Sequence, residues 1–370
     1  MERVEFAVVG AGVMGSAAAR ALAARGVPAV LLEQFELGHA RGSSHGANRI
    51  FRFSYPDPVY VRMAVAAREA WLRLQDEAGE QLLTTTGGLD AGRRAERCAA
   101  ALSECGVPHS WLTEGDVRER FPGIAPRPGE LMLWQEDGGV LLAARAVAAL
   151  QRLAGRDGAS LRPATPVLGI EAQGDGVLLR TPDGEIRARV AVVTAGGWAG
   201  GLLGPALTGM PPLTATLQQV RYYAAADPGA RWPTFIEWSD DDSGWYAVPV
   251  AGGAPGVKVA RHDPGRPVDP RTGPFAEIDL ELEHAAARYT SERLPGLLPT
   301  ALQAHTCLYT MTADQDFLLD RAGPVVVGGG GSGHAFKFGP LLGEILADLA
   351  LGKDPAIPRD RFSLSRTAPR

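Results

Sequence analysis

Three basic side chains lie in one short stretch of the chain, GSSHGANRIFRFSY, residues 42–55. His45, Arg49 and Arg52 stand among glycine, serine and aromatic residues, a composition typical of a loop. A guanidinium group suits a carboxylate or phosphate, because its planar fork donates two parallel hydrogen bonds. The stretch therefore predicts an anion site. The alternative is a surface loop whose arginines pair with nearby acids.

A glycine-rich turn precedes this stretch; its glycines are Gly10, Gly12 and Gly15. Apolar runs at 4–9 and 29–32 flank it, an alanine-rich helical segment lies between them, and the second run ends at Glu33. This order is the dinucleotide-binding fingerprint: the glycines allow a tight turn, close approach to a pyrophosphate and helix packing, and the acid accepts from a ribose hydroxyl. A strand–helix turn without a ligand is the alternative.

A second glycine-rich segment follows the apolar run at 325–328 near the C-terminus, as GGGGSG at 328–333 and HAFKFGP at 334–340. Pro340 suits the first turn of a helix, where its missing N–H costs nothing. A helix N-terminus favours negative charge. This segment is therefore a suitable place for an anionic group, such as the pyrimidine side of a reduced flavin. A flexible loop that caps a packed helix is the alternative.

Composition narrows the class of protein. The 370 residues are long enough for two domains, and 45% hydrophobic with 21% charged residues is ordinary for a globular chain. A net charge of −5 gives no reason to expect nucleic acid or an anionic membrane. The three cysteines, Cys98, Cys105 and Cys307, do not form a disulfide framework. With no signal peptide, spanning segment or metal motif recognised, we expect a cytoplasmic protein without a metal site.

The pattern along the chain predicts helices at 59–77 and 143–153, a strand at 190–193, and a Trp-, Tyr- and Pro-rich sheet at about 211–299. The alternation of strands and helices stops after Glu33 and returns only at 325. Because NAD dehydrogenases usually continue with a second mononucleotide half, this interruption favours FAD over NAD.

Four motifs together resemble one known family: Gly10-x-Gly12-x-x-Gly15, the stretch at 42–55, CLYT at 307–310 and GSGHAFKF at 331–338. They are similar, in the same order and over nearly the whole chain, to the amine-oxidising flavoproteins of the monomeric sarcosine oxidase, N-methyltryptophan oxidase and pipecolate oxidase family. The resemblance implies a mixed α/β (α+β) fold. An FAD-binding Rossmann-like domain of the glutathione-reductase type would take residues 1–82, 140–215 and 305–370, and an antiparallel-sheet substrate domain residues 83–139 and 216–304.

The resemblance also implies an activity. A monomeric enzyme would oxidise a secondary, N-methylated or cyclic amino acid to an imine by hydride transfer to FAD, and dioxygen would become hydrogen peroxide. The alternatives are a related FAD-dependent dehydrogenase that passes electrons to a carrier, and a nucleotide-binding protein without redox chemistry.

By resemblance, Arg49 lies against the flavin ring with His45 near it, while Arg52 and Lys337 hold the substrate carboxylate. Two cations that converge on one anion would fix the α-carbon beside the flavin. Their field would also lower the proton affinity of the substrate amine, and only the neutral amine can give up a hydride.

Two further residues have redox roles in the family. By resemblance, Lys258 stabilises superoxide forming from dioxygen on the opposite face of the flavin, and Cys307 is the thioether link to the flavin's 8α methyl group. The alternatives are a lysine on the wet face of a strand and a small buried cysteine.

The resemblance assigns the remaining site residues to three groups. Tyr309 joins the catalytic group. The expected pocket wall is Tyr55, Phe235, Ile236, Trp245, Tyr246 and His262, with core packing as the rival explanation for each. Besides the fingerprint residues and Cys307, the expected cofactor contacts are Ser44, Val167, Gly196, Trp198, Gly331, Gly333 and Lys337.

Three positions depart from the sarcosine-specific pattern. Met311 stands where those enzymes often carry lysine, Trp245 replaces a tyrosine and Ser44 replaces a histidine. These departures favour a bulkier or cyclic substrate over sarcosine, and a biosynthetic role on an unusual amino acid is equally open.

Overall fold

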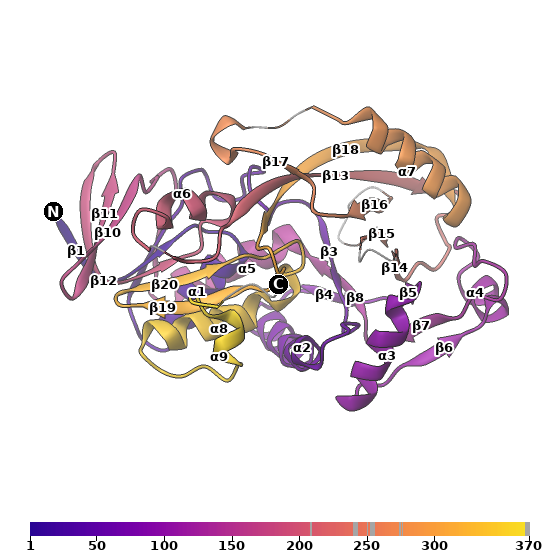
Figure 1. The fold of residues 1–370 in the computed structure, drawn as a ribbon, viewed down its shortest axis with the longest axis horizontal. Helices are drawn as coiled ribbons and strands as arrows, with labels where there is room; N and C mark the ends of the chain where they lie inside the picture. The colour runs from indigo at the N-terminus through magenta and orange to yellow at the C-terminus, as the bar shows by residue number, and fades with distance from the viewer. Residues whose placement is uncertain are drawn as a thin grey trace.

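The computed structural model describes residues 1–207, 209–239, 243–249, 251, 256–273, 275 and 277–366. In this part of the chain the strands form sheets of eight, nine and three strands. Figure 1 shows the eight-stranded sheet at the left and the strands of the nine-stranded sheet toward the right. Both chain ends contribute to the first sheet, through β1 (Glu2–Val9) and β20 (Val325–Gly329).

The eight-stranded sheet is built on neighbouring parallel strands in the order β9–β2–β1–β12–β20. The new strands are β2 (Ala29–Leu32), β9 (Ser160–Arg162) and β12 (Gly184–Val193). Antiparallel strands complete it: β19 (Leu318–Ala322) beside β20, and the hairpin β10 (Gly169–Gln173) and β11 (Gly176–Thr181) beside β12. The mixed α/β fold expected from the sequence is confirmed.

Alternate side chains of the parallel strands face two buried layers. Phe6 and Val8 of β1 join a core with helices α1 (Val13–Ala23), α2 (Pro58–Ala78), α5 (Ala143–Arg156) and α8 (Gly339–Ala350). Ala7 and Val9 face the other core, with the β10–β11 hairpin and α6 (Ala199–Leu203). Burial on both faces explains why these strands read as continuous apolar runs.

Local chemistry sets the bounds of α2, which follows the basic stretch. The Asp57 carboxylate accepts from the N–H of Val59 at 2.8 Å, and Pro58 occupies the first turn. Gly79 ends the helix in the left-handed conformation, with a φ of 66°. The helix predicted at 59–77 is confirmed, as is the one predicted at 143–153.

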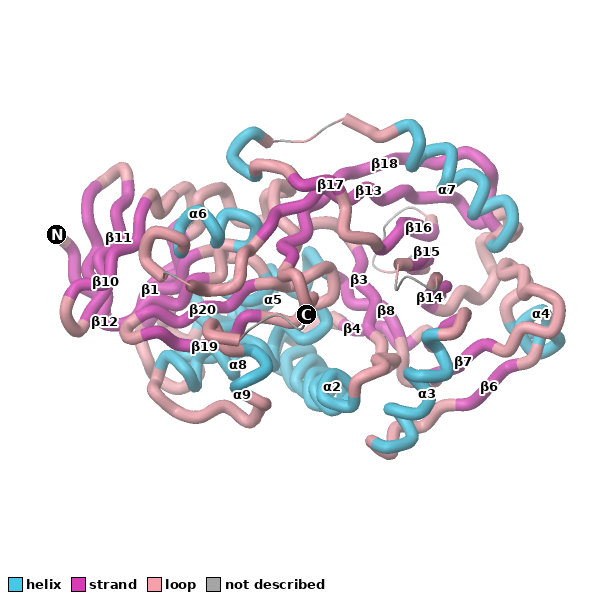
Figure 2. The backbone as a smooth tube through the Cα atoms, in the orientation of Figure 1, coloured by secondary structure: helices cyan, strands magenta, loops and turns pink. Residues whose placement is uncertain are grey.

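The nine-stranded sheet runs in the order β17–β13–β16–β15–β14–β5–β7–β6, with β18 on the other side of β13. Neighbours are antiparallel except β5 and β14. Figure 2 shows the long strands β13 and β18 side by side. The bounds are β5 (Gly88–Ala91), β6 (Ser110–Leu112), β7 (Met132–Gln135), β13 (Thr214–Ala225), β14 (Thr234–Trp238), β15 (Gly244–Val248), β16 (Val257–His262), β17 (Arg266–Pro267) and β18 (Leu297–Met311).

A small antiparallel sheet contains part of the basic stretch. Its order is β3 (Asn48–Phe51), β8 (Gly139–Leu142) and β4 (Leu83–Thr85). Residues 48–51, expected in a loop, are therefore a strand. Pairing with β8 fixes the direction of the Arg49 side chain and leaves Arg52 just beyond the strand end.

Helices lie within and beside the region that was expected to form the second sheet. The region at about 211–299 was expected as a sheet, but it also holds helix α7 (Leu280–Arg293), which begins at an Asp279 cap. Cys98 lies in helix α3 (Arg94–Glu104). The short helix α4 (Glu114–Arg120) starts with a capping box on Thr113. The predicted domain boundary before residue 305 falls inside β18.

The close approach of α8 to the backbone of α1 requires glycine at position 343. A Cβ atom at Gly343 of α8 would lie 2.5 Å from the backbone carbon of Ala17 in α1. We expect Gly343→Ala to lower the free energy of unfolding by about 1–3 kcal/mol, because the helices must separate. Gly155 of α5 is the matched control, since its added Cβ would meet only Leu161 at 3.6 Å.

Thermal and denaturant unfolding measure both variants. Gly155→Ala should be neutral or stabilising by about 0.5–1 kcal/mol, because alanine favours a helix. A Gly343→Ala protein as stable as the unsubstituted chain would contradict the close contact of α1 with α8.

Candidate active site

One cavity of about 1280 Å³ joins the two glycine-rich segments and the nine-stranded sheet. Its size exceeds the roughly 300–1,000 Å³ usual for a drug-sized ligand. Most of the predicted site residues line it: Gly10, Gly12, Glu33, Ser44, His45, Arg49, Arg52, Val167, Gly196, Trp198, Ile236, Tyr246, Lys258, His262, Cys307, Tyr309, Gly331, Gly333 and Lys337. Gly15, Tyr55, Phe235 and Trp245 lie outside this lining.

The fingerprint glycines form a close turn at one end of the cavity. Gly10 has a φ of 97°, and a Cβ there would lie 2.7 Å from the carbonyl oxygen of Thr194. Gly15 lies behind the cavity wall, where a Cβ would collide with the carbonyl oxygen of Gly10 at 1.8 Å. Only glycine permits this packing of α1 on the sheet.

Two backbone N–H groups at the start of α1 are held by side chains. The Glu33 carboxylate accepts from the N–H of Ala11 at 2.8 Å, and the Ser44 hydroxyl accepts from the N–H of Val13 at 3.0 Å. Burial raises the pKa of Glu33, but hydrogen bonds with His39 and with the backbone N–H groups of Ala11 and Phe35 together hold this pKa below its usual value. Glu33 thus lines the cavity as an anion next to the helix N-terminus.

An aromatic group lies beyond Glu33. Phe35 meets Trp198 edge to face with ring centroids 5.6 Å apart, and the Arg41 guanidinium lies 4.6 Å from the centre of Phe35. Trp198 was predicted to contact the cofactor, and Val167 and Gly196 line the same cavity. Phe35 and Arg41 were missed, although they lie next to Glu33 and the basic stretch.

Arg49 organises the loop before β3. Its guanidinium donates to the carbonyl oxygens of Ser43, His45 and Asn48 at 2.8, 2.6 and 2.8 Å. The same group lies 5.5 Å from the ring centre of Phe336 in the second glycine-rich segment. Burial and the nearby Arg49 charge lower the pKa of His45 to about 4. Of the three basic residues in the stretch, His45 is therefore neutral at pH 7.

Arg52 and Lys337 meet at one tyrosine. The Arg52 guanidinium lies 4.1 Å from the ring centre of Tyr55, while Lys337 Nζ donates to the Tyr55 hydroxyl at 2.9 Å and to the His334 carbonyl at 2.7 Å. Both cations are 6% exposed and line the cavity. Within the described residues, no carboxylate forms an ion pair with either one, so two buried cations face the cavity without a directly bound acid.

The cost of this burial is visible at Lys337. Burial, and then the neighbouring Arg52 charge, lower the pKa of Lys337 well below its usual value. A carboxylate bound at both cations would reverse this effect, because it favours the charged ammonium. Tyr55 itself stands behind the wall as a partner of both cations, so its expected place in the cavity lining is wrong.

Lys258 and Cys307 lie on neighbouring parts of the second sheet. Lys258 Nζ donates to the Asn48 carbonyl at 2.6 Å, and burial followed by the Arg49 charge lowers its pKa to about 7. The lysine is buried, which excludes the wet-face alternative. Burial raises the pKa of the Cys307 thiol, while Arg49 and Lys258 oppose that rise.

Strand alternation corrects two predicted wall residues. On β14, Ile236 lines the cavity but the preceding Phe235 belongs to a separate buried core. On β15, Tyr246 lines the cavity but Trp245 stacks on Tyr289 at 4.7 Å on the other side. Consecutive strand residues point to opposite faces, so neither pair can share the wall. Trp238, two residues after Ile236, lines the cavity and was missed.

Two wall residues pair with each other. His262 Nδ1 lies 3.5 Å from the Tyr309 hydroxyl, and both line the cavity. Burial and the Arg52 charge lower the pKa of His262 to about 4, and burial raises that of Tyr309 well above its usual value. Both groups are therefore neutral at pH 7, and this part of the wall is polar and aromatic without carrying charge.

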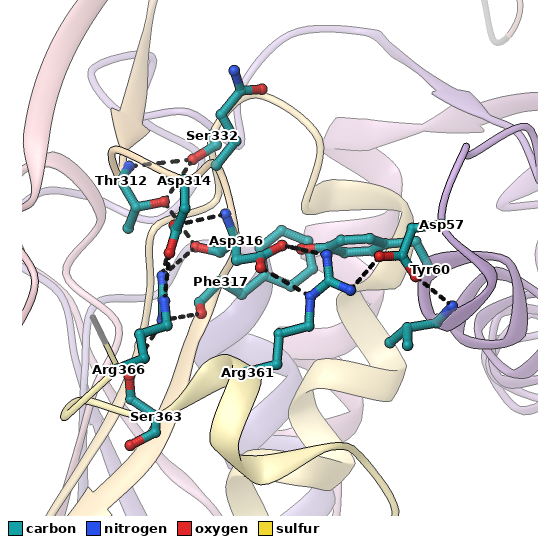
Figure 3. Close-up of polar contacts among 12 residues, drawn as sticks. Asp57, Tyr60, Thr312, Asp314, Asp316, Phe317, Ser332, Arg361, Ser363 and Arg366 are labelled. Atoms are coloured by element: carbon teal, nitrogen blue, oxygen red, sulfur yellow. Dashed lines mark hydrogen bonds and ion pairs between the residues drawn. The ribbon is translucent and has the colours of Figure 1, made fainter. Parts of the chain in front are cut away.

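The C-terminal segment clamps the loop after β18 (Figure 3). Arg366 binds Asp314 through two nitrogens at 2.7 and 3.0 Å, and Arg361 of α9 (Arg359–Phe362) binds Asp316 twice at 2.9 Å. Arg361 also pairs with Asp57 at the start of α2. These pairs hold the loop next to the glycine-rich segment, where Thr312 and Ser332 hydrogen bond.

None of the three departures from the sarcosine pattern forms a described contact with Arg52 or Lys337. Trp245 faces the other core, Met311 is outside the cavity lining, and Ser44 binds the N-terminus of α1. They therefore give no support to a bulkier substrate.

Comparison with known proteins gives the family. A profile described as "FAD dependent oxidoreductase" matches residues 5–349. The chain is 36% identical over 378 residues to monomeric sarcosine oxidase from Streptomyces avermitilis, covering 98% of this chain and 97% of the relative. It is 34% identical over 373 residues to human (Homo sapiens) peroxisomal sarcosine oxidase, covering 97% and 95%.

A solved structure has a similar fold over the whole chain. NikD, described as "an unusual amino acid oxidase essential for nikkomycin biosynthesis", superposes with a TM-score of 0.89 at 27% identity and covers 100% of this chain and 99% of that one.

The residues present fit FAD. The glycine cradle and the N-terminus of α1 suit a pyrophosphate, Glu33 suits a ribose, and the cavity continues from there to Lys258, Cys307 and Lys337. The chain belongs to the family of FAD-dependent oxidoreductases, and it is similar to sarcosine oxidases and to an amino acid oxidase.

Proposed function

We propose that this protein is an FAD-dependent oxidase of a secondary, N-methylated or cyclic amino acid, which forms an imine and reduces dioxygen to hydrogen peroxide. One observation carries the proposal: Arg52 and Lys337, from opposite ends of the chain, converge on Tyr55 beside the cavity with no described acid as partner. A cavity that holds two cations without an ion-paired acid favours an anionic ligand. The substrate carboxylate is the anion that an amino acid supplies.

The cations bind and orient the substrate. Arg52 and Lys337 hold the carboxylate from two directions, which fixes the α-carbon and its nitrogen. Their field lowers the pKa of the substrate amine and so favours its neutral form. His262 and Tyr309, which lie 3.5 Å apart in the wall, are the polar groups proposed to face the amine. FAD, when bound, supplies the acceptor for the hydride and the electron donor for dioxygen.

Other residues of the chain hold the cofactor. The glycine turn, Ser44 and Glu33 take its dinucleotide part, and Arg49 with His45 take the edge of its ring system. Lys258 is the proposed cation for the reduction of dioxygen, and Cys307 is the proposed covalent attachment point. The two-domain division, the monomeric state and the cytoplasmic location stay predictions.

A dehydrogenase of the same fold is the second candidate. Lys258 favours the oxidase, because it places a buried ammonium group in the cavity wall, 2.6 Å from the Asn48 carbonyl oxygen. An enzyme that passes electrons to a carrier has no need of a cation to stabilise charge on oxygen.

No helix within the described residues combines the length and the apolar composition needed to cross a bilayer.

The first prediction here tests the oxidase itself. Purified holoenzyme should release hydrogen peroxide with N-methyl or cyclic amino acids. In Lys258→Met, substrate should reduce the flavin without air at a near-normal rate, but reoxidation in air should slow by about a hundredfold or more, because a preorganised charge is lost.

Stopped-flow absorbance of the flavin separates the two half-reactions. Lys353→Met, at an exposed lysine after α8, is the matched control and should change neither. Unchanged reoxidation in Lys258→Met would remove Lys258 from the oxygen reaction. Fast reduction by substrate with slow reoxidation in the unsubstituted enzyme would favour the dehydrogenase.

Carboxylate binding should depend on pH through Lys337. Only the protonated ammonium binds an anion strongly, and burial places its pKa well below the usual value. The affinity of the holoenzyme for benzoate should therefore be highest at low pH and fall as pH rises through this lowered pKa. Flavin absorbance changes on benzoate addition, between about pH 6 and 10, measure it.

Lys337→Met should weaken benzoate binding at neutral pH by about tenfold to a hundredfold, the loss expected for a charge-assisted hydrogen bond. Its affinity should also no longer show that decline with pH. The same decline in Lys337→Met as in the unsubstituted enzyme would assign the titration to another group.

Covalent attachment gives a separate test. After precipitation with acid, the yellow flavin should stay with the unsubstituted protein and should pass into the supernatant for Cys307→Ala. Cys105→Ser is the matched control, since Cys105 is half-buried with its sulfur near the Pro58 carbonyl, and it should retain the flavin. Flavin retained by Cys307→Ala would contradict the proposed link.

A further inference from the structure

Trp238 occupies the cavity wall beside the proposed carboxylate site. It is 6% exposed and ends strand β14, on the same face as Ile236. The guanidinium carbon of Arg52 lies 5.2 Å from its ring centre and that of Arg94 lies 4.2 Å away. The ring of His262 meets it edge to face at 6.1 Å. A substrate held by Arg52 therefore has this indole as a neighbour.

A buried acid fixes the position of the indole. Asp90 of β5 is 1% exposed, and its Oδ1 accepts from Trp238 Nε1 at 3.2 Å. Residue 90 pairs with Ile236 in the parallel ladder between β5 and β14, so the backbone of the two strands sets this contact. Asp90 forms no part of the cavity lining. It can act on a substrate only through the residues that it holds.

The same acid reaches the Arg52 segment by a second route. Asp90 Oδ2 accepts from Gln135 Nε2 at 2.9 Å, and Gln135 Oε1 accepts from the backbone N–H of Phe53 at 2.9 Å. Gln135 is as buried as Asp90. One carboxylate thus ties down the indole on one side and the backbone next to Arg52 on the other.

The charge of Asp90 also matters here. Burial raises the pKa of Asp90, while the Arg52 and Arg94 charges oppose this rise. Among the described residues, Asp90 is the buried acid on which the Arg52 charge acts, although no ion pair joins them. The Arg52 guanidinium donates to the Ser54 carbonyl oxygen and forms no ion pair with a described acid, while Asp90 partly offsets the cost of burying its charge.

We propose that Trp238 is a specificity-determining residue of the substrate pocket, and that Asp90 is the positioning residue which locks its indole next to Arg52. The proposal rests on the amino-acid oxidation described above. A locked indole cannot swing away to enlarge the pocket, and together with Ile236, Tyr246 and the neutral His262 it offers an apolar, aromatic surface. This surface favours an amino acid whose nitrogen or side chain carries a ring over a small one such as sarcosine.

Trp238→Phe tests the wall. It removes the N–H donor and part of the ring, so the selectivity, measured as kcat/KM for a ring-bearing substrate (pipecolate or N-methyltryptophan, whichever the unsubstituted enzyme oxidises faster) divided by that for sarcosine, should fall about tenfold. The loss should lie mainly in KM, because the reacting carbon and Arg52 are untouched. An unchanged ratio would overturn the role of Trp238.

Asp90→Asn tests the positioning role by a double-mutant cycle. The variant should lower the same ratio, and Asp90→Asn/Trp238→Phe should be no less selective than Trp238→Phe alone, because Asp90 acts through the indole. Fully additive losses would overturn that link. Asp137→Asn is the matched control. Asp137 lies two residues after Gln135, the last residue of β7, but it pairs with Arg68 at the surface. The selectivity ratio of this variant should not change.

Two readouts separate a wall defect from a folding defect. Flavin content and thermal midpoint report folding, and if Asp90→Asn does not fold, the ratio in Trp238→Phe still decides the specificity claim. An unsubstituted holoenzyme that oxidises no amino acid refutes the proposed function. An active enzyme whose selectivity is the same in all variants refutes only the proposed roles of Trp238 and Asp90.

Discussion

Buried positive charge without an ion-paired acid is the constraint on which this site depends. Arg52 and Lys337 are held against Tyr55 inside the protein, and the groups in contact with them include tyrosine, tryptophan and histidine. The Arg52 charge acts on buried Asp90, but no ion pair joins the two residues. Such an arrangement costs stability, and the molecule reduces the cost where it can: burial lowers the pKa values of Lys337, Lys258, His45 and His262. The anion proposed to bind here would recover the remaining cost.

The fold brings these charges together from distant parts of the chain. Arg52 follows the first strand–helix–strand unit, Lys258 lies on the second sheet, and Lys337 lies just before α8. Each lies on or next to an element that is held by its own contacts. Strand β3 pairs with β8, and β16 pairs with β13 and β15. Trp71 of α2 donates to the Lys337 carbonyl oxygen at 2.7 Å and so holds the turn at Lys337 to α2. The site is therefore only as rigid as the packing of α2 and α8 on the first sheet.

The sequence predicted what depends on local chemistry. Positive φ and close packing require glycine at Gly10 and Gly15, so the nucleotide turn could be read from composition and spacing alone. The wall of the pocket could not, because the resemblance assigns neighbouring residues to it without showing which face of a strand each side chain occupies. Phe235 and Trp245 face away for the simple reason that a strand alternates, and applying that period to Ile236 would have found Trp238. Asp90 gave no signal, because its role depends on the pairing of β5 with β14, two strands more than a hundred residues apart.

The most direct test of this account is a crystal structure of the holoenzyme with bound benzoate or a slowly oxidised amino acid. The account predicts one carboxylate within hydrogen-bond distance of both the Arg52 guanidinium and Lys337 Nζ, with the rest of the ligand against Trp238. A carboxylate bound elsewhere in the cavity, with Arg52 and Lys337 both unengaged, would contradict it.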